Sequence, residues 1–298
     1  MIQQEHVEAG AETAEGGVDL GHLLMEHAAD AYSLHFEPFP PIEWNPHLLE
    51  FQLAGITINM TPTKHLIYMV FAAAMVFLVM WRAGKRLEAQ RAGENAPKGW
   101  ANAVEGLVLW VRNDVAIGNI GPDGAKFAPY IMSLFFFILF CNLLGLVPWG
   151  ATPTSNLAVT AALAALSLVV IEVSGMMKLG FGGYMRTIFP KVAGISGPGA
   201  VVLSVALGPI EFMGKLVKPI ALCIRLFGNM TAGHFVILAM FGIIFLFGNI
   251  EYARWAIGGA SALLVLAIMM LELIVAFVQA YVFTLITAVL IGIMQHEH

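Results

Sequence analysis

The feature that most constrains the fold is a long apolar run that carries a permanent charge. Residues 219–248, PIALCIRLFGNMTAGHFVILAMFGIIFLFG, are long enough to cross a bilayer, yet they contain Arg225. An arginine at the centre of a membrane helix costs roughly 3 kcal/mol on insertion scales. A chain that keeps this charge must either shield it or use it, so Arg225 is the first candidate for a functional residue.

Composition predicts an all-α integral membrane protein. Of the 298 residues, 59% are hydrophobic and 12% are charged, whereas soluble domains carry about 25% charged residues. Cys141 and Cys223 both lie in apolar segments, which favours packing over a disulfide or a metal site. The chain has no phosphate-binding loop, HExxH motif, paired CxxC or GxSxG motif. We therefore expect no cofactor, no metal and no nucleic-acid partner, and any nucleotide chemistry would take place in another chain.

The charges are separated along the chain. Residues 1–63 contain ten of the twenty acidic residues and no lysine or arginine. This region lacks the pattern of a signal or transit peptide, so we interpret it as a mature tail outside the membrane. The same absence favours a bacterial plasma membrane over an organelle, although a copy encoded in an organelle would need no transit peptide. The first predicted span, 66–81, is followed at once by basic residues, which places its end inside and the tail outside. These basic residues are Arg82, Lys85, Arg86 and Arg91.

The middle of the chain predicts a surface helix and two further spans. Residues 99–117 have one apolar helical face, typical of an amphipathic helix at the inner interface, made of Val104, Leu107, Val108, Val111 and Val115. A second span, about 127–147, runs outward. A third, about 157–177, returns to an inner loop that carries Lys178, Arg186 and Lys191.

The last third contains two helical stretches that are too long to stand upright. Residues 201–249 and 256–294 would measure about 73 and 58 Å as helices, against a hydrocarbon core of about 30 Å. Either each breaks into two spans, or both form a steeply tilted hairpin. Neither stretch contains a clear turn signal, although Pro209 and Pro219 could kink the first. We favour the hairpin, which gives about five membrane helices and a C-terminus in the cytoplasm. The predicted organisation is 1–63 (acidic tail), 64–126 (first span and surface helix), 127–192 (second and third spans) and 193–298 (hairpin).

Polar residues on this hairpin share faces and depths. Glu211, Lys218 and Arg225 are seven residues apart and define one helical face. His234 is nine residues beyond Arg225, half a turn away, and so points to the opposite side. If the hairpin turns near Tyr252, Arg225 and Gln279 lie the same number of residues from the turn, and so at the same depth. His234 and Glu272 lie at nearly equal distances from it.

Simpler interpretations of these residues remain open at this level. Arg225 could extend to the inner surface, or could neutralise Glu211. His234 could be a packing residue, or could exchange protons with Glu272. Asn229 and Gln279 could be hydrogen-bonding links between helices. Glu172 fits an interfacial or packing role better than a place on an ion pathway.

One family shares these motifs. KPIALCIRLFGNMTAGH (218–234) and FVQAYVFTLITAVLI (277–291) resemble subunit a of the F-type ATP synthase, the stator beside a rotating ring of c subunits. FCNLLGLVPWGATPTSNLAVT (140–160) and MTPTKHLIYM (60–69) extend the resemblance over most of residues 45–295.

The resemblance implies a non-catalytic, proton-conducting subunit of the bacterial plasma membrane. Its partners would be lipid, the c ring and the b-type subunits of the peripheral stalk. Arg225 would face the c-ring carboxylate between two aqueous half-channels. Asn229, His234, Glu272 and Gln279 would line the outer half-channel, and Glu211 would belong to the inner route. Well-known members carry Glu at the position of His234 and His at that of Glu272, so acid and imidazole are exchanged here.

Two other classes are less consistent with the sequence. An ion-coupled secondary transporter would be built from repeats, and no second copy of the Arg225 segment is present. An intramembrane enzyme would need a nucleophile with a base on its own face, and Thr231 and Cys223 have none. The sequence does not determine the number of c subunits, the choice between protons and sodium ions, which of His234 and Glu272 titrates, or the role of the tail.

Overall fold

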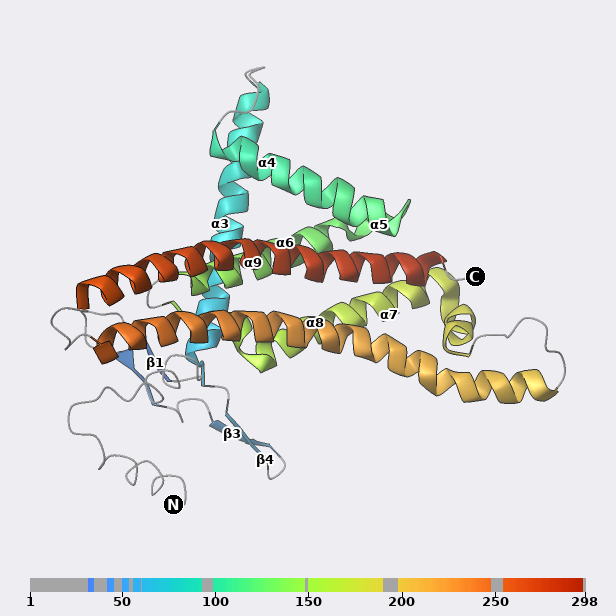
Figure 1. The fold of residues 1–298 in the computed structure, drawn as a ribbon. Coiled ribbons are helices and arrows are strands. Elements are labelled where there is room, and N and C mark those ends of the chain that lie inside the picture. The colour runs from blue at the N-terminus through green and yellow to red at the C-terminus, as the bar shows by residue number, and fades with distance from the viewer. Residues whose placement is uncertain are drawn as a thin grey trace. The chain divides into compact units, whose positions relative to one another are not determined.

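The computed structural model describes residues 32–34, 42–45, 50–53, 56–59, 61–92, 99–147, 150–189, 198–247 and 254–296. These residues fold into long helices and a few short strands (Figure 1). The chain divides into a smaller unit, Met1–Lys64 with Thr231–Leu273, and a larger unit, His65–Met230 with Ile274–His298.

Five of the described helices are long and apolar enough to cross a bilayer, as the sequence predicts. They are α3 (Lys64–Ala92), α6 (Gly124–Gly145), α7 (Leu157–Ile188), α8 (Pro198–Phe247) and α9 (Arg254–His296). The shorter helices are α4 (Trp100–Trp110), the π-helix η1 (Val111–Ile117), α5 (Gly118–Ile120) and the 3₁₀-helix η2 (Pro153–Ser155).

The two last helices are continuous, which decides between the alternatives left open by the sequence. α8 has 50 residues and includes Pro209 and Pro219, and α9 has 43 residues. A proline removes one helical hydrogen bond and often ends a helix, yet here α8 continues through both positions. Neither stretch breaks into two spans. The steep tilt of the pair in a membrane stays a prediction.

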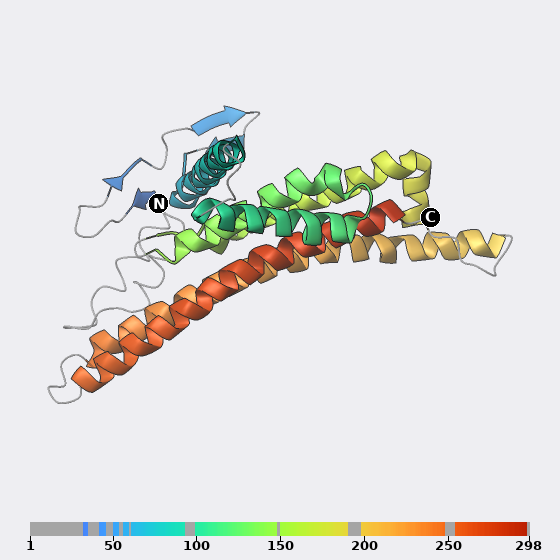
Figure 2. The ribbon, with the colours of Figure 1, turned by 90° about the horizontal axis from the view of Figure 1, so that it is seen from above.

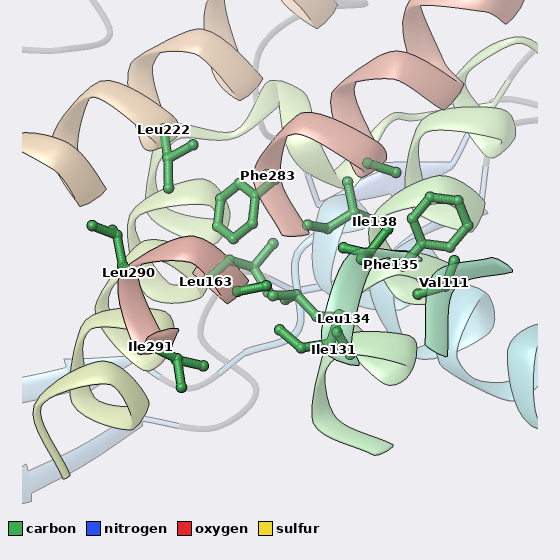
Figure 3. Close-up of a cluster of buried hydrophobic side chains, with 14 of the residues drawn as sticks. Val111, Ile131, Leu134, Phe135, Ile138, Leu163, Leu222, Phe283, Leu290 and Ile291 are labelled. Atoms are coloured by element: carbon green, nitrogen blue, oxygen red, sulfur yellow. The ribbon is translucent and has the colours of Figure 1, made fainter. Parts of the chain in front are cut away.

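The core of the larger unit is built around α6. Phe135, Ile131 and Ile138 of this helix are fully buried. Leu163 of α7, Leu222 of α8 and Phe283 of α9 belong to the same cluster, and Figure 3 shows these side chains together with those of α6. This packing holds the parts of α8 and α9 that belong to the larger unit against α6 and α7, and these parts carry Arg225 and Gln279.

The predicted amphipathic helix forms, but its apolar face packs on protein. Val111 and Val115 are buried in the core cluster, and Trp110 stacks on Tyr281 of α9 with ring centroids 5.2 Å apart. The last part of this segment is the π-helix η1, which the sequence did not predict. Asn119 Nδ2 donates to the carbonyls of Asp114 at 2.9 Å and Val115 at 2.8 Å in this segment.

The predicted inner loop after the third span is partly wrong, because α7 continues to Ile188. The helix bends at Gly180, whose φ of 69° lies in the region that glycine adopts without strain (Figure 2). Lys178 and Arg186 are therefore helical, while Lys191 lies outside the described residues. At the start of α6, Asp123 accepts from Lys126 at 2.8 Å and from Lys178 of α7 at 2.5 Å.

The described part of the N-terminal tail contains short strands, in addition to the all-α membrane region. β1 (Ser33–Leu34) pairs with β2 (Ile42–Glu43), and β3 (Glu50–Leu53) with β4 (Ile56–Asn59), both antiparallel. Trp44 Nε1 donates to the carbonyl of Pro62 at 2.8 Å, so the chain beside β2 is tied to the residues that precede α3.

Candidate functional site

A hydrogen bond joins α9 to α8 at Arg225. Gln279 Nε2 donates to the backbone carbonyl of Arg225 at 2.9 Å, and the Gln279 side chain is only 4% exposed. A helical carbonyl has a second lone pair for such a bond. The two residues, which the sequence places at equal distances from the turn, therefore lie side by side, and their depth in a membrane stays a prediction. The bond holds the backbone of Arg225, while the Arg225 side chain is exposed.

Arg225 opens onto a mostly apolar groove of about 320 Å³. Asn229 and Gln279 supply the other polar groups, and the rest of the lining comes from α9: Ile274, Val275, Val278 and Val282. Among the residues that the structure describes, no salt bridge includes Arg225. A guanidinium stays protonated in such surroundings, so this groove presents one fixed positive charge beside apolar side chains.

A second polar network ties α6 to α9 close to Gln279. Thr154 Oγ1 donates to Asn142 Oδ1 at 2.6 Å, and Asn142 Nδ2 donates to the carbonyl of Ala276 at 3.2 Å. Asn142 and Thr154 are buried. Ala276 is three residues before Gln279, so this network positions the turn of α9 that holds the Arg225 backbone. Asn142 is not among the functional residues predicted from the sequence, although an amide alone in an apolar span indicates a partner on another helix.

Glu272 lies against the backbone of α8 in the smaller unit. A methyl group added at Gly233 would lie 2.0 Å from Glu272 Oε1, so the approach requires the missing side chain of glycine. Glu272 is half-buried. His234 follows Gly233 in α8, but its side chain lies outside the described residues. The structure therefore brings Glu272 to the helical turn that carries His234, and the predicted pair of imidazole and carboxylate stays a prediction.

Glu211 belongs to a separate cluster of charged residues on α7 and α8. A cavity of about 30 Å³ is lined by Glu172, Glu211, Lys215 and Lys218, with apolar residues of α7 and α9. Tyr184 Oη donates to Glu172 Oε2 at 2.5 Å, and Lys215 Nζ donates to Thr187 Oγ1 at 2.8 Å. Burial, followed by the neighbouring Glu172, raises the pKa of Tyr184 to about 12. The sequence favours an interfacial or packing role for Glu172 and does not reveal that it lies beside Glu211.

No metal centre is evident in the described ranges, where no three His, Cys, Asp or Glu side chains come together in a way that could hold an ion. Cys141 and Cys223 are both buried thiols. The chemistry that this arrangement offers is therefore that of fixed charges, carboxyl groups and hydrogen-bonding side chains.

Comparison with known proteins identifies similar chains. The model of the ATP synthase A chain family matches residues 66–292. ATP synthase subunit a of Chloroherpeton thalassium is 39% identical over 274 residues, covering 92% of this chain and 77% of the relative. ATP synthase subunit a 2 of Chlorobaculum tepidum is 40% identical over 289 residues, covering 97% and 77%. The subunit a of Myxococcus xanthus is 41% identical over 245 residues, covering 81% and 76%.

Proposed function

We propose a site-level mechanism for this chain from the premise that it belongs to the ATP synthase A chain family. Members of this family are the proton-translocating stator component of the membrane sector, and are not themselves catalytic. The chain is accordingly a multi-span membrane subunit that works in an assembly with other subunits. The transporter alternative is not favoured.

The central proposal is that Arg225 is the fixed charge that faces a carboxylate of a c-subunit ring. The observation that carries it is the bond from Gln279 to the Arg225 carbonyl, which holds the backbone and leaves the guanidinium exposed beside an apolar groove. A fixed cation in a region of low dielectric favours the ionised form of an opposing carboxylic acid. Each arriving acid therefore releases its proton on one side of Arg225 and is reprotonated on the other.

Arginine suits this role because it keeps its proton where lysine can lose it. The fixed charge also opposes the direct passage of protons between the two half-channels. Moving one proton across the membrane supplies about 2.3 kcal/mol per 100 mV. The arrangement makes ring rotation the route by which this energy is used.

Asn229, His234, Glu272 and Gln279 form the outer half-channel in this proposal. Asn229 and Gln279 line the groove of Arg225, and Glu272 packs against Gly233 next to His234. An imidazole and a carboxylate at one depth can relay a proton in either order. Although His234 and Glu272 exchange acid and imidazole relative to well-known members, one imidazole and one carboxylate are still present for such a relay. Glu211 belongs to the inner route, where it lines a polar cavity.

We further assign the b-type subunits of the peripheral stalk as partners, and the bacterial plasma membrane as the location, with the N-terminus outside and the C-terminus in the cytoplasm. The cluster of basic residues that follows the first span supports this orientation.

The test is proton pumping by inverted vesicles that contain the whole complex with Arg225→Ala. The proposal predicts the loss of ATP-driven acidification and of ATP synthesis, with ATP hydrolysis by the soluble sector intact. Coupled pumping near the native level would show that Arg225 is a structural or surface-directed charge. Arg225→Lys separates charge from geometry, because a lysine keeps a cation but loses the planar guanidinium.

A further inference from the structure

A cavity between α7, α8 and α9 is lined by four ionisable side chains. Two carboxyl groups, Glu172 and Glu211, and two ammonium groups, Lys215 and Lys218, line it. Its volume of about 30 Å³ exceeds the roughly 10–15 Å³ that one water needs. Water in such a polar space has several hydrogen-bonding partners. The cavity therefore suits a short hydrated connection between its carboxyl groups.

We propose that Glu172 is a second carboxyl of the inner proton route, which exchanges protons with Glu211 through water in this cavity and is positioned by Tyr184. This inference rests on the proposed function, since it extends the inner route that begins at Glu211. It assigns Glu172 a role that the sequence alone did not favour.

The surroundings of Glu172 are built to hold a carboxyl group at the cavity. Tyr184 lies beyond the bend at Gly180 and donates from its hydroxyl to Glu172 Oε2 at 2.5 Å. Lys215 Nζ lies 5.3 Å from the centroid of the Tyr184 ring and is held by Thr187 Oγ1. α8 faces the cavity with Glu211, Lys215 and Lys218, while α9 contributes only Leu290, Ile293 and Met294. Every charged group around Glu172 in this lining therefore comes from α8.

The proton transfer balances without any other reactant. A proton that reaches Glu211 as the carboxylic acid passes through a water to the Glu172 carboxylate, and Glu211 returns to its charged form. Glu172 then releases the proton to water on the inner side and regains its charge. The Tyr184 phenol, whose pKa is raised, keeps its own proton and stays a donor throughout.

The test uses Glu172→Gln. Glu88→Gln on α3 is the matched control, because Glu88 is an exposed glutamate far from Glu172 in the sequence. Passive proton flux is measured in vesicles that carry the membrane sector without the catalytic sector, under a potassium diffusion potential, at several values of inner-side pH. Flux is normalised to the amount of assembled subunit. Glutamine still accepts the Tyr184 bond, so this variant removes proton exchange with little change in packing.

The proposal predicts that Glu172→Gln lowers proton flux severalfold and flattens the dependence of flux on inner-side pH. Glu172→Asp should restore most of the flux and most of its pH dependence. Glu88→Gln should have no effect on either. Tyr184→Phe is expected to shift the pH profile while flux remains. Native flux and a native pH profile in Glu172→Gln, with flux lowered in Glu211→Gln, would overturn the inference and leave the proposed function intact. Failure of the proposed function would instead show as coupled pumping in Arg225→Ala.

Discussion

Gln279 Nε2 and the carbonyl oxygen of Arg225 lie 2.9 Å apart, so the buried amide of α9 holds the backbone from which the exposed guanidinium extends. The two residues are 54 positions apart in the sequence. The bond is one of the contacts that set the distance between α8 and α9 at this level. The position of the charge therefore depends on a side chain that does not itself carry charge.

Gln279→Leu removes this donor and should impair coupling more than assembly. Interhelical hydrogen bonds in membranes contribute about 0.6–1.7 kcal/mol, which a packed helix pair can lose without unfolding, whereas the Arg225 backbone loses its anchor. We expect ATP-driven acidification to fall severalfold at an unchanged amount of complex. Leu266→Ala, at an exposed position of α9, is the control. Native pumping in Gln279→Leu would show that the bond does not position Arg225.

Gly233→Ala tests the close approach of Glu272 to α8. The added methyl group would lie 2.0 Å from Glu272 Oε1, so the carboxylate has to move. We expect reduced proton flux because Glu272 is displaced from the turn that carries His234. Gly259→Ala is a matched control in α9, since nothing lies within 4 Å of a Cβ there. Equal flux in the two variants would contradict a role for this contact.

The order of acid and imidazole at 234 and 272 leads to a third prediction. His234→Ala and Glu272→Ala should each lower proton flux. The double exchange His234→Glu with Glu272→His should retain much of it, because a relay between the two groups works in either direction. Passive proton flux through the membrane sector at a series of pH values measures this. If the exchanged pair is as inactive as the single variants, the two residues do not form one relay.

Asp123 gives a prediction of pH-dependent stability outside the membrane spans. The hydrogen bonds from Lys126 and from Lys178, with the charges of both lysines, lower the pKa of Asp123 from 3.8 to about 2. Because the folded-state pKa is depressed, the stabilisation is present above pH 3.8 and is lost as the pH falls toward 2.

Asp123→Asn should therefore destabilise the protein at neutral pH, and its difference from the native chain should disappear as the pH falls through and below about 2. Thermal unfolding of the detergent-solubilised protein at a series of pH values measures this. The effect should also shrink at high salt, because Asp123 is accessible to solvent. Asp114→Asn, at an exposed position of η1, removes the same charge elsewhere. A constant difference between native and Asp123→Asn at all pH values would contradict the assignment.

The arrangement of Arg225 and Gln279 could be predicted because a helix has a fixed rise and the two residues are counted from one turn. The continuity of α8 through Pro209 and Pro219 could not be decided that way, since it depends on packing against neighbouring helices. Glu172 shows a further limit. Its partner Tyr184 is brought near by the bend at Gly180, which periodicity does not reveal.

Asn142 illustrates the same limit over a longer distance. Its amide donates a hydrogen bond to the carbonyl of Ala276, 134 residues away, and the local sequence does not indicate which residue accepts this bond. The π-helix η1 was likewise missed, because its sequence fits an ordinary amphipathic helix. Local periodicity therefore predicted which elements form, while the partners of buried polar groups required the tertiary structure.

Passive proton flux through membranes that lack the catalytic sector, compared between the native chain and Arg225→Ala, tests the central claim most directly. If Arg225 separates two half-channels, the variant should conduct protons at least as well as the native chain while ATP-driven pumping by the whole complex is lost. Loss of passive flux together with pumping, at equal amounts of assembled subunit, would show that Arg225 supports the structure of the path. Retention of native pumping would contradict the account entirely.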